Sequence, residues 1–382
     1  MYRLSSEQHA IVEKARQVAV EQIAPHAAQV DEHGEFPRRS IDALGAEGYL
    51  GLMVPTELGG MGQGMRVACA VLDEIAQCCA STAMIYLMHL CGVANYLNAP
   101  QPPRDLLRAA AEGKHLSTLA WSERGSRSHF WAPVSKPTRQ DGSIMLDADK
   151  SFVTSAGEAD GYSISTLWWD AEQPLQSVLY VALRDDPGLS VSGEWSGMGM
   201  RGNASAPMTL RNVILADDRL LSEPGKGFDG MLALLPVFQL GNAAVQVGIA
   251  EAAVQATLQH VTSARLEHLD QRLCDSPIVR DRLAQMRIET DRGRAHLVAT
   301  IEAVEQPGPT TMLLVLESTA AAAETSMRVT DLAMRTAGGA AYGRRLSLDR
   351  HFRDARAAGV MAATTDALHD FIGRALCGME LF

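Results

Sequence analysis

Three short segments of this chain bring together hydroxyl-bearing, basic and glycine residues. WSERGSRSH runs from Trp121 to His129, KSFVTS runs from Lys150 to Ser155, and RTAGGAAYG begins at Arg335. In the third segment, Gly338 and Gly339 let a ligand approach the backbone closely, and the Arg335 guanidinium can pair with an anionic group. Each segment also has a plainer interpretation, as a capped turn, a packed strand or a helix C-cap.

The first half of the chain is helical and then strand-rich. From Ser5 to Val30 apolar residues recur at helical spacing, with Ser5 or Ser6 as the N-cap and Pro25 bending or breaking the run. A short helix is expected from about Arg38, and the breaker-free residues 65–98 predict one or two buried helices. Between about residues 116 and 222, short alternating runs separated by glycine turns predict an antiparallel sheet.

Helical patterning returns in the last third of the chain. Long apolar-periodic segments span roughly 228–264, 276–305, 309–336 and 361–377, with Pro307-Gly308-Pro309 as the clearest break. Their number and length predict a four-helix arrangement.

Composition limits the classes of partner. The 382 residues are 47% hydrophobic and 21% charged, which is typical of a globular protein with a large core. A net charge of −11 without a basic run argues against nucleic acid or an anionic membrane as partner. The six cysteines show neither metal-ligand nor disulfide-scaffold spacing, and no secretory signal or membrane span is predicted. We therefore expect a cytoplasmic protein that acts on small molecules and holds no metal.

The order of elements and the three segments resemble the acyl-CoA dehydrogenase family over nearly the whole chain. The resemblance implies an N-terminal helical domain at 1–114, a middle antiparallel β-domain at 115–224 and a C-terminal four-helix bundle at 225–382. It also implies FAD as cofactor, with the flavin beside the middle domain, and a homo-oligomer, dimer or tetramer, whose subunits complete each other's FAD sites.

Matching the family's motifs residue by residue gives the expected cofactor contacts. The WSERGSRSH segment stands where the family has Leu-Thr-Glu-Pro-Gly-x-Gly-Ser-Asp, and KSFVTS resembles its Lys-x-Trp-Ile-Thr-Asn strand. An aromatic side chain there can cover the flavin ring, and the Thr154 hydroxyl can bond flavin N5. The expected FAD-binding residues are Trp121, Ser122, Ser128, Phe152, Val153, Thr154, Ser155, Arg265, Arg335, Gly338, Gly339 and Thr364.

The family's catalytic glutamate is absent from both of its common positions. RDARAAGVMAATT, from Arg353 to Thr365, keeps the frame of the segment that carries this base, but Ala362 stands in its place. At the alternative position, Phe238 and Gln239 replace the family's Glu-Arg pair. A general base must reach the proton it removes, and an alanine methyl cannot accept one.

Three functions remain open from the sequence. The favoured one is a flavin-dependent oxygenase or monooxygenase, which needs no α-proton base, with Thr154 and His129 as polar groups near the flavin. A dehydrogenase with a relocated base is the second, and Asp366, four residues after Ala362, would then share its helical face. The third is a flavin-binding protein without catalysis.

The substrate and redox partners follow from the same resemblance. A small molecule, such as a CoA thioester, is expected to contact His89, Phe238, Gln239 and Ala362. The oxygenase hypothesis adds O2 and a flavin reductase or electron-transfer partner.

Overall fold

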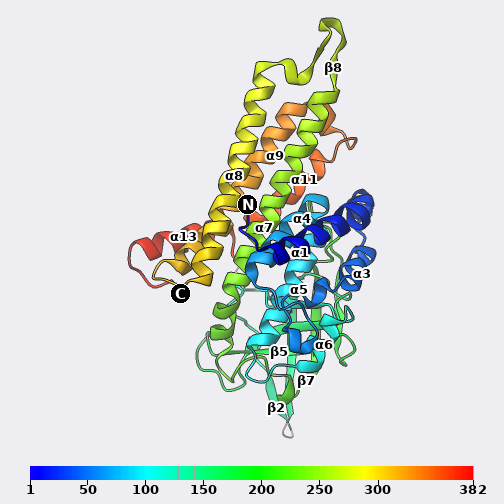
Figure 1. Ribbon diagram of the computed structural model, residues 1–382. Helices are drawn as coiled ribbons and strands as arrows, with labels where there is room; N and C mark the ends of the chain where they lie inside the picture. Colours follow the sequence, from blue (N-terminus) through cyan, green and yellow to red (C-terminus); the bar gives the residue numbers. More distant parts are fainter. Residues whose placement is uncertain (127–128, 141–142, 382) are drawn as a thin grey trace.

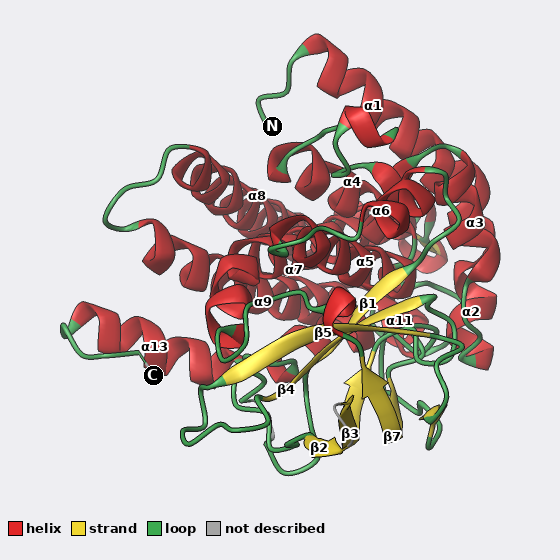
Figure 2. Ribbon diagram, turned by 90° about the horizontal axis from the view of Figure 1, so that it is seen from below, coloured by secondary structure: helices red, strands yellow, loops and turns green. Residues whose placement is uncertain are grey.

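The computed structural model describes residues 1–126, 129–140 and 143–381, which form an N-terminal helical domain, a middle β-domain and a C-terminal helical domain. Figure 1 shows the strands of the middle domain at one end of the molecule and the long C-terminal helices extending toward the other end. Figure 2 shows the strands gathered on one side of the helices. The three expected types of domain are confirmed in this order.

The N-terminal domain follows its predicted capping and break signals. Helix α1 (Ser6–Val18) begins after Ser5, whose side chain accepts a hydrogen bond from the Gln8 N–H in a capping box. Pro25 lies in a 3₁₀ turn, after which α2 (Ala27–His33) starts. The remaining helices are α3 (Arg38–Ala46), α4 (Met65–Cys78), α5 (Ala80–Asn98) and α6 (Arg104–Ala111).

Two sheets make up the middle domain. One has the strand order β1 (Ser117–Ala120), β4 (Gly161–Leu167), β5 (Ser177–Leu183). The other has the order β2 (Thr138–Gln140), β3 (Ser143–Val153), β7 (Ala206–Leu215), β6 (Leu189–Val191). All pairs in these sheets are antiparallel except β1 with β4, which run parallel. The predicted antiparallel pairing therefore holds for these strands apart from the pair of β1 and β4.

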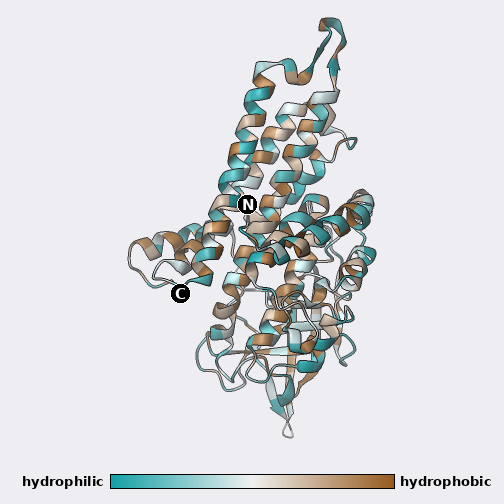
Figure 3. Ribbon diagram, in the orientation of Figure 1, coloured by the Kyte–Doolittle hydropathy of each residue, from teal (hydrophilic) through white to brown (hydrophobic). Residues whose placement is uncertain are grey.

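The long helix α7 (Gly227–Ser263) connects the domains. It has 37 residues, so it spans about 55 Å at the usual helical rise. It packs against α4 and α5, and also against α8 (Pro277–Glu305) and α9 (Thr311–Ala337). By length and composition α7 could cross a membrane, but most of its apolar window is buried inside the protein. Figure 3 shows hydrophilic and hydrophobic residues mixed along α8 and α9, as expected for helices with one buried stripe, whereas the middle of α7 is buried on all sides.

The fourth helix of the bundle differs from the prediction. It is α11 (Leu348–Ala355), which packs on both α7 and α9. The short helices α10 (Gly339–Tyr342) and α12 (Ala357–Val360) flank α11, and α13 (Thr365–Leu376) lies mainly against α9. The expected helix over 361–377 thus begins only at Thr365. A hairpin of β8 (Arg265–Leu266) and β9 (Gln271–Arg272) caps the far end of the bundle (Figure 1).

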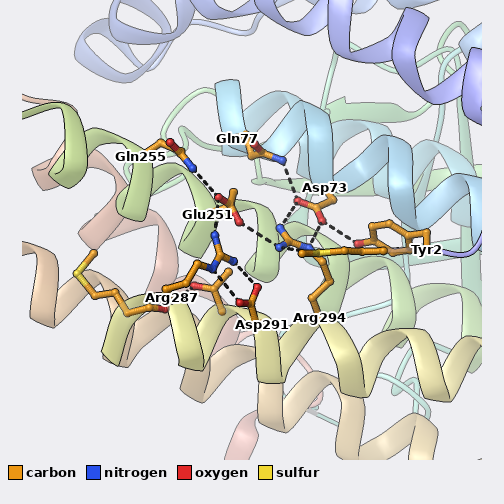
Figure 4. A network of polar contacts seen from close by, with 11 residues as sticks. Tyr2, Asp73, Gln77, Glu251, Gln255, Arg287, Asp291 and Arg294 are labelled. Carbon is orange, nitrogen blue, oxygen red and sulfur yellow. Dashed lines mark hydrogen bonds and ion pairs between the residues drawn. The ribbon is translucent and has the colours of Figure 1, made fainter. Parts of the chain in front are cut away.

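A buried polar network fastens the N-terminal domain to the bundle (Figure 4). Arg294 of α8 donates to Asp73 of α4 over 2.9 Å and to Glu251 of α7 over 3.0 Å. The hydroxyl of Tyr2 donates to the same aspartate, and Arg287 donates to the same glutamate. Because every charge has a partner, the network offsets much of the cost of its burial.

Candidate functional site

A cavity of about 750 Å³ lies where the three domains meet. Its walls come from α5, from the ends of β1 and β3, from the loop before β7, from the start of α7 and from the segment between α11 and α13. The volume is that of a site for an organic ligand of substantial size. The lining residues fall into an apolar set and a polar set. The apolar ones include Met84, Met88, Leu119, Trp121, Phe130, Phe152, Trp195, Met200, Met231, Leu235, Phe238 and Met361.

The cavity has no acidic lining among the described residues. Its only charged side chains there are those of Arg353 and Arg356, and none is Asp or Glu. Ala362 and Thr364 both line the cavity. This wall provides no carboxylate that could remove a proton from carbon.

A buried ion pair holds the hydroxyl-bearing wall together. Lys150 and Glu123 are both almost fully buried, and their charged atoms lie 2.6 Å apart. The carboxylate also accepts hydrogen bonds from the backbone N–H groups of Val134 and Ser135. Burial acts to raise the pKa of Glu123, but Lys150 and the hydrogen bonds outweigh it, so this pKa is lowered. The pair fixes the two predicted segments side by side.

The ion pair places Ser122 and Ser151 on the cavity. The Ser151 N–H donates to the Ser122 carbonyl over 2.9 Å, and both residues line the wall. Phe152 comes next, with a φ of 54° and 71% of its surface exposed. A large apolar ring in this backbone conformation is unusual, and it leaves a flat face free for a ligand.

Thr154 provides a hydroxyl at the same wall. Its Oγ1 lies 3.0 Å from Ser205 Oγ, and both residues are buried and line the cavity. Its carbonyl accepts a hydrogen bond from the Thr118 hydroxyl, which anchors the strand end. Asn203 also lines the cavity, and among the described residues its Oδ1 has no hydrogen-bond partner. The wall therefore offers a polar strip beside apolar rings.

The other predicted residues of these two segments lie behind the wall or outside the described residues. Trp121 lines the cavity and donates from its ring N–H to Ser163 over 3.4 Å. Val153 and Ser155 are buried and do not line it, although Ser155 Oγ has no partner among the described residues. The predicted contact Ser128 lies outside the described residues.

Asp366 does not take the position expected of a relocated base. Its proposed closeness to Ala362 required one continuous helix, but α12 ends at Val360 and α13 begins at Thr365. Thr364 is the N-cap of α13, accepting from the Ala367 N–H. Asp366 is in the first turn of α13, is exposed and does not line the cavity. The expectation is corrected because the chain bends between the two residues.

Two predicted substrate contacts are also corrected. His89 is fully buried; its ring bonds the Leu50 carbonyl over 2.7 Å and accepts from the Ser117 N–H. Burial lowers its pKa to about 4, so it is a neutral core residue. Phe238 lines the cavity, whereas Gln239 is buried away from it in α7. Successive helical residues point about 100° apart, which separates this pair.

His129 and the residues at the far end of the bundle lie away from the cavity. His129 is exposed and its ring lies 4.9 Å from that of Trp131. Arg265 is in the β8–β9 hairpin and pairs with Asp270. From Met231 on the cavity to the end of α7 is about 48 Å of helix, so Arg265 and this cavity cannot share one cofactor within a single chain.

The glycine pair lies at the same end of the bundle. Gly338 ends α9 in a positive-φ conformation, and Gly339 starts α10. A Cβ at either position would meet no atom within 4 Å, so their backbones are open to approach. Arg335 is exposed on α9, 3.9 Å from Asp331.

Several residues that line the cavity were not singled out from the sequence. Met84, Met88, Trp195, Asn203 and Ser205 enter the cavity from elements far apart in the chain. The Glu123–Lys150 pair was missed as well, although each residue sits in a recognised segment. Among the described residues, no group of three potential His, Cys, Asp or Glu ligands is arranged to hold a metal ion.

Comparison with known proteins covers all three domains. Residues 5–101, 118–213 and 225–377 match the N-terminal, middle and C-terminal domains of acyl-CoA dehydrogenases, respectively. Cyclohex-1-ene-1-carbonyl-CoA dehydrogenase of Syntrophus aciditrophicus is 27% identical over 98% of this chain and 91% of its own length. Human mitochondrial short-chain specific acyl-CoA dehydrogenase is 24% identical over 93% of this chain and 86% of its own.

Solved structures agree in fold. Butyryl-CoA dehydrogenase from Megasphaera elsdenii superimposes with a TM-score of 0.92 at 22% identity, covering 98% of this chain and 99% of its own. PigA with FAD and proline gives 0.90 at 18% identity, covering 99% of each chain. At such identities these structures establish the architecture alone. Together with the three matched domains and the full-length relatives, they show that the chain belongs to the acyl-CoA dehydrogenase superfamily.

Proposed function

We propose that this protein is an FAD-dependent oxygenase that acts on a small organic substrate without a carboxylate base. Membership of the superfamily makes it a flavoprotein oxidoreductase whose cofactor is FAD. The observation that carries the oxygenase assignment is the absence of Asp and Glu from the described lining of the cavity, with Ala362 at the family's base position. Desaturation of a thioester requires such a base, whereas oxygenation does not.

The residues present fit a flavin. Trp121 and the exposed ring of Phe152 provide flat apolar surface, and Ser122, Ser151 and Thr154 provide polar groups beside it. The unpartnered Asn203 Oδ1 is a buried acceptor on the same wall, suited to an N–H of a bound ring. FAD would supply two-electron redox chemistry and, once reduced, reactivity toward O2.

The protein's own groups would then bind, orient and exclude water. The Thr154–Ser205 hydroxyl pair can donate a hydrogen bond into the cavity, next to where the family's threonine meets flavin N5. The methionine and aromatic side chains exclude water from the reacting region. One oxygen atom of O2 would enter the substrate and the other would leave as water, with two electrons from a reductase or an electron-transfer partner and two protons taken from solvent.

Cofactor contacts at the far end of the bundle would come from a second copy of the chain. Gly338, Gly339, Arg335 and Arg265 lie at the end of the bundle away from the start of α7, yet they match family contacts to FAD. In a homo-oligomer, dimer or tetramer, this end of one subunit could meet the cavity of a neighbour. One FAD could then contact both the far-end residues and the residues that line the cavity.

Desaturation of an acyl-CoA is the second candidate, favoured by the full-length relatives, which are named as dehydrogenases of CoA thioesters. The ligands of related proteins do not all carry CoA, since PigA is seen with proline. We therefore consider both CoA thioesters and small molecules without CoA as substrates.

Anaerobic mixing with saturated acyl-CoAs separates the two functions. We expect butyryl-CoA, octanoyl-CoA and cyclohexanecarbonyl-CoA to leave the flavin of the wild-type holoenzyme oxidised. Ala362→Glu should bleach it and form enoyl-CoA, and Ala362→Gln, which has a similar shape but cannot accept the proton, should not. Bleaching of the wild-type flavin with formation of enoyl-CoA would overturn the oxygenase proposal in favour of desaturation.

A further inference from the structure

Two arginines border the cavity from the end of α11, and they differ in their partners. Arg353 forms ion pairs with Asp31 over 2.5 Å and with Asp349 over 3.0 Å. It also donates to the Met198 carbonyl over 3.1 Å. Two carboxylates and a carbonyl thus occupy its donors, and its charge is neutralised within the protein.

Arg356, one helical turn later, has no such partner. Among the described residues no carboxylate lies within 4.0 Å of its guanidinium, and no acceptor bonds it. The guanidinium carbon lies 4.1 Å from the centre of the Phe352 ring, a cation–π contact that fixes the position of the charge while leaving its N–H donors free. Arg356 is half-buried and lines the cavity.

The surroundings make this charge dominant in the cavity. The other lining residues are mostly apolar, and the described ones include no acidic side chain. An apolar wall screens a charge less than water does, so the free guanidinium gives the cavity a positive potential. Its planar set of donors matches the two oxygens of a carboxylate.

We propose that Arg356 binds a carboxylate of the substrate, so that the enzyme acts on an organic acid with an apolar or aromatic body. The body would lie among the methionine and aromatic residues, and the carboxylate would point to the segment between α11 and α12. This inference rests on the proposed function only in that the cavity receives FAD and a small substrate.

Other oxyanions could reach the same guanidinium. The FAD pyrophosphate and the phosphates of CoA share the chemistry of a carboxylate toward arginine. Loss of Arg356 would have a different effect for each of the three candidate anions. It would lower the FAD content if the guanidinium binds the pyrophosphate, and the affinity for free CoA if it binds a CoA phosphate. If it binds the substrate carboxylate, the loss would remove the preference for acids over neutral analogues of equal shape.

The test uses matched ligand pairs on the oxidised holoenzyme. Cinnamate with cinnamamide, and octanoate with octanamide, are titrated while the flavin absorbance is followed. We expect the wild type to bind each acid about tenfold or more tightly than its amide, as for a charge-assisted hydrogen bond. Arg356→Gln should abolish that preference, Arg356→Lys should restore part of it, and Arg39→Gln, which removes an exposed arginine elsewhere, should leave it unchanged.

Each contrary result overturns the proposal. The wild type could bind acid and amide equally or bind neither of them, or the preference for acids could survive in Arg356→Gln. Arg356→Gln could lose FAD, which would assign the guanidinium to the pyrophosphate. It could also lose affinity for free CoA alone. Because binding is measured without turnover, bleaching by acyl-CoA would defeat the oxygenase proposal and leave this result standing.

Discussion

We propose Thr154 as the residue that contacts the bound flavin most directly. Its hydroxyl borders the cavity, has Ser205 as neighbour, and sits on a strand end that Thr118 anchors. A hydrogen bond from this hydroxyl to flavin N5 would strengthen as negative charge develops there on reduction. The hydroxyl would therefore favour the reduced state.

Thr154→Val tests that role. A net hydrogen bond contributes about 1 kcal/mol, and about 30 mV corresponds to about 1.4 kcal/mol for a two-electron couple. We expect the flavin reduction potential to fall by about 20 mV with FAD content retained. Thr154→Ser, which keeps the hydroxyl, should stay near the wild type in a spectroelectrochemical titration. An unchanged potential in Thr154→Val would show that the hydroxyl does not contact the flavin.

At the scale of elements, the site depends on how two chain segments are joined. Lys150 on β3 and Glu123 after β1 form a buried ion pair. The adjacent residues Ser151 and Ser122 are thereby held next to each other at the cavity. Removing one partner leaves an uncompensated charge in the protein interior, which is more costly than removing both.

Lys150→Met should therefore destabilise the fold by about 3–5 kcal/mol and weaken FAD retention. The double variant Lys150→Met with Glu123→Gln should recover part of that loss, because no charge is then left unpaired. Lys136→Met, which changes an exposed lysine of the same domain, should have little effect. Urea unfolding and flavin content measure both effects. A double variant less stable than Lys150→Met would contradict the role of the ion pair.

Element-level prediction from the sequence succeeded where the signal was local. Ser5 caps α1, the breaker-free stretch forms α4 and α5, and the long periodic segments form α7, α8 and α9. It failed at the end of the chain, where apolar periodicity over 361–377 predicted a helix from residue 361 and the chain instead bends until Thr364 caps α13. Propensity cannot decide such a boundary, because packing against neighbouring elements fixes it.

At the scale of the whole molecule, the polar network around Arg294 joins three helices and the N-terminal segment. Burial acts to raise the pKa of Glu251, but hydrogen bonds from Arg287 and Gln255 and the charge of Arg294 lower it to about 2. A carboxyl group with a lowered folded-state pKa stabilises the protein above its unfolded pKa. That contribution is lost as the pH falls through the folded value.

Glu251→Gln should thus lower the free energy of unfolding at neutral pH by about 2–3 kcal/mol. The difference from the wild type should shrink as the pH falls from about 4.5 toward 2, where the wild-type carboxyl becomes protonated. Glu112→Gln, at an exposed ion pair, serves as control. Urea midpoints over a pH series provide the measurement, and a difference that does not change with pH would refute the assignment.

The sequence alone could not predict which of the candidate substrate contacts line the cavity. Ala362 and Phe238 were placed at the cavity by motif alone, since the family frame fixes their positions. His89 and Gln239 could not be judged in that way, because burial and side-chain direction depend on contacts far along the chain. Long-range packing decides which polar residues in a helix face a ligand and which are buried in the core.

The exposed ring of Phe152 has a consequence for the life of the protein before it acquires its cofactor. Before FAD binds, a newly synthesised chain exposes this apolar ring to solvent beside the apolar cavity. Exposed apolar surface of this kind favours aggregation. A flat ligand that covers the ring would also shield it, so we expect the supply of flavin in the cell to govern how much of the chain survives to maturity.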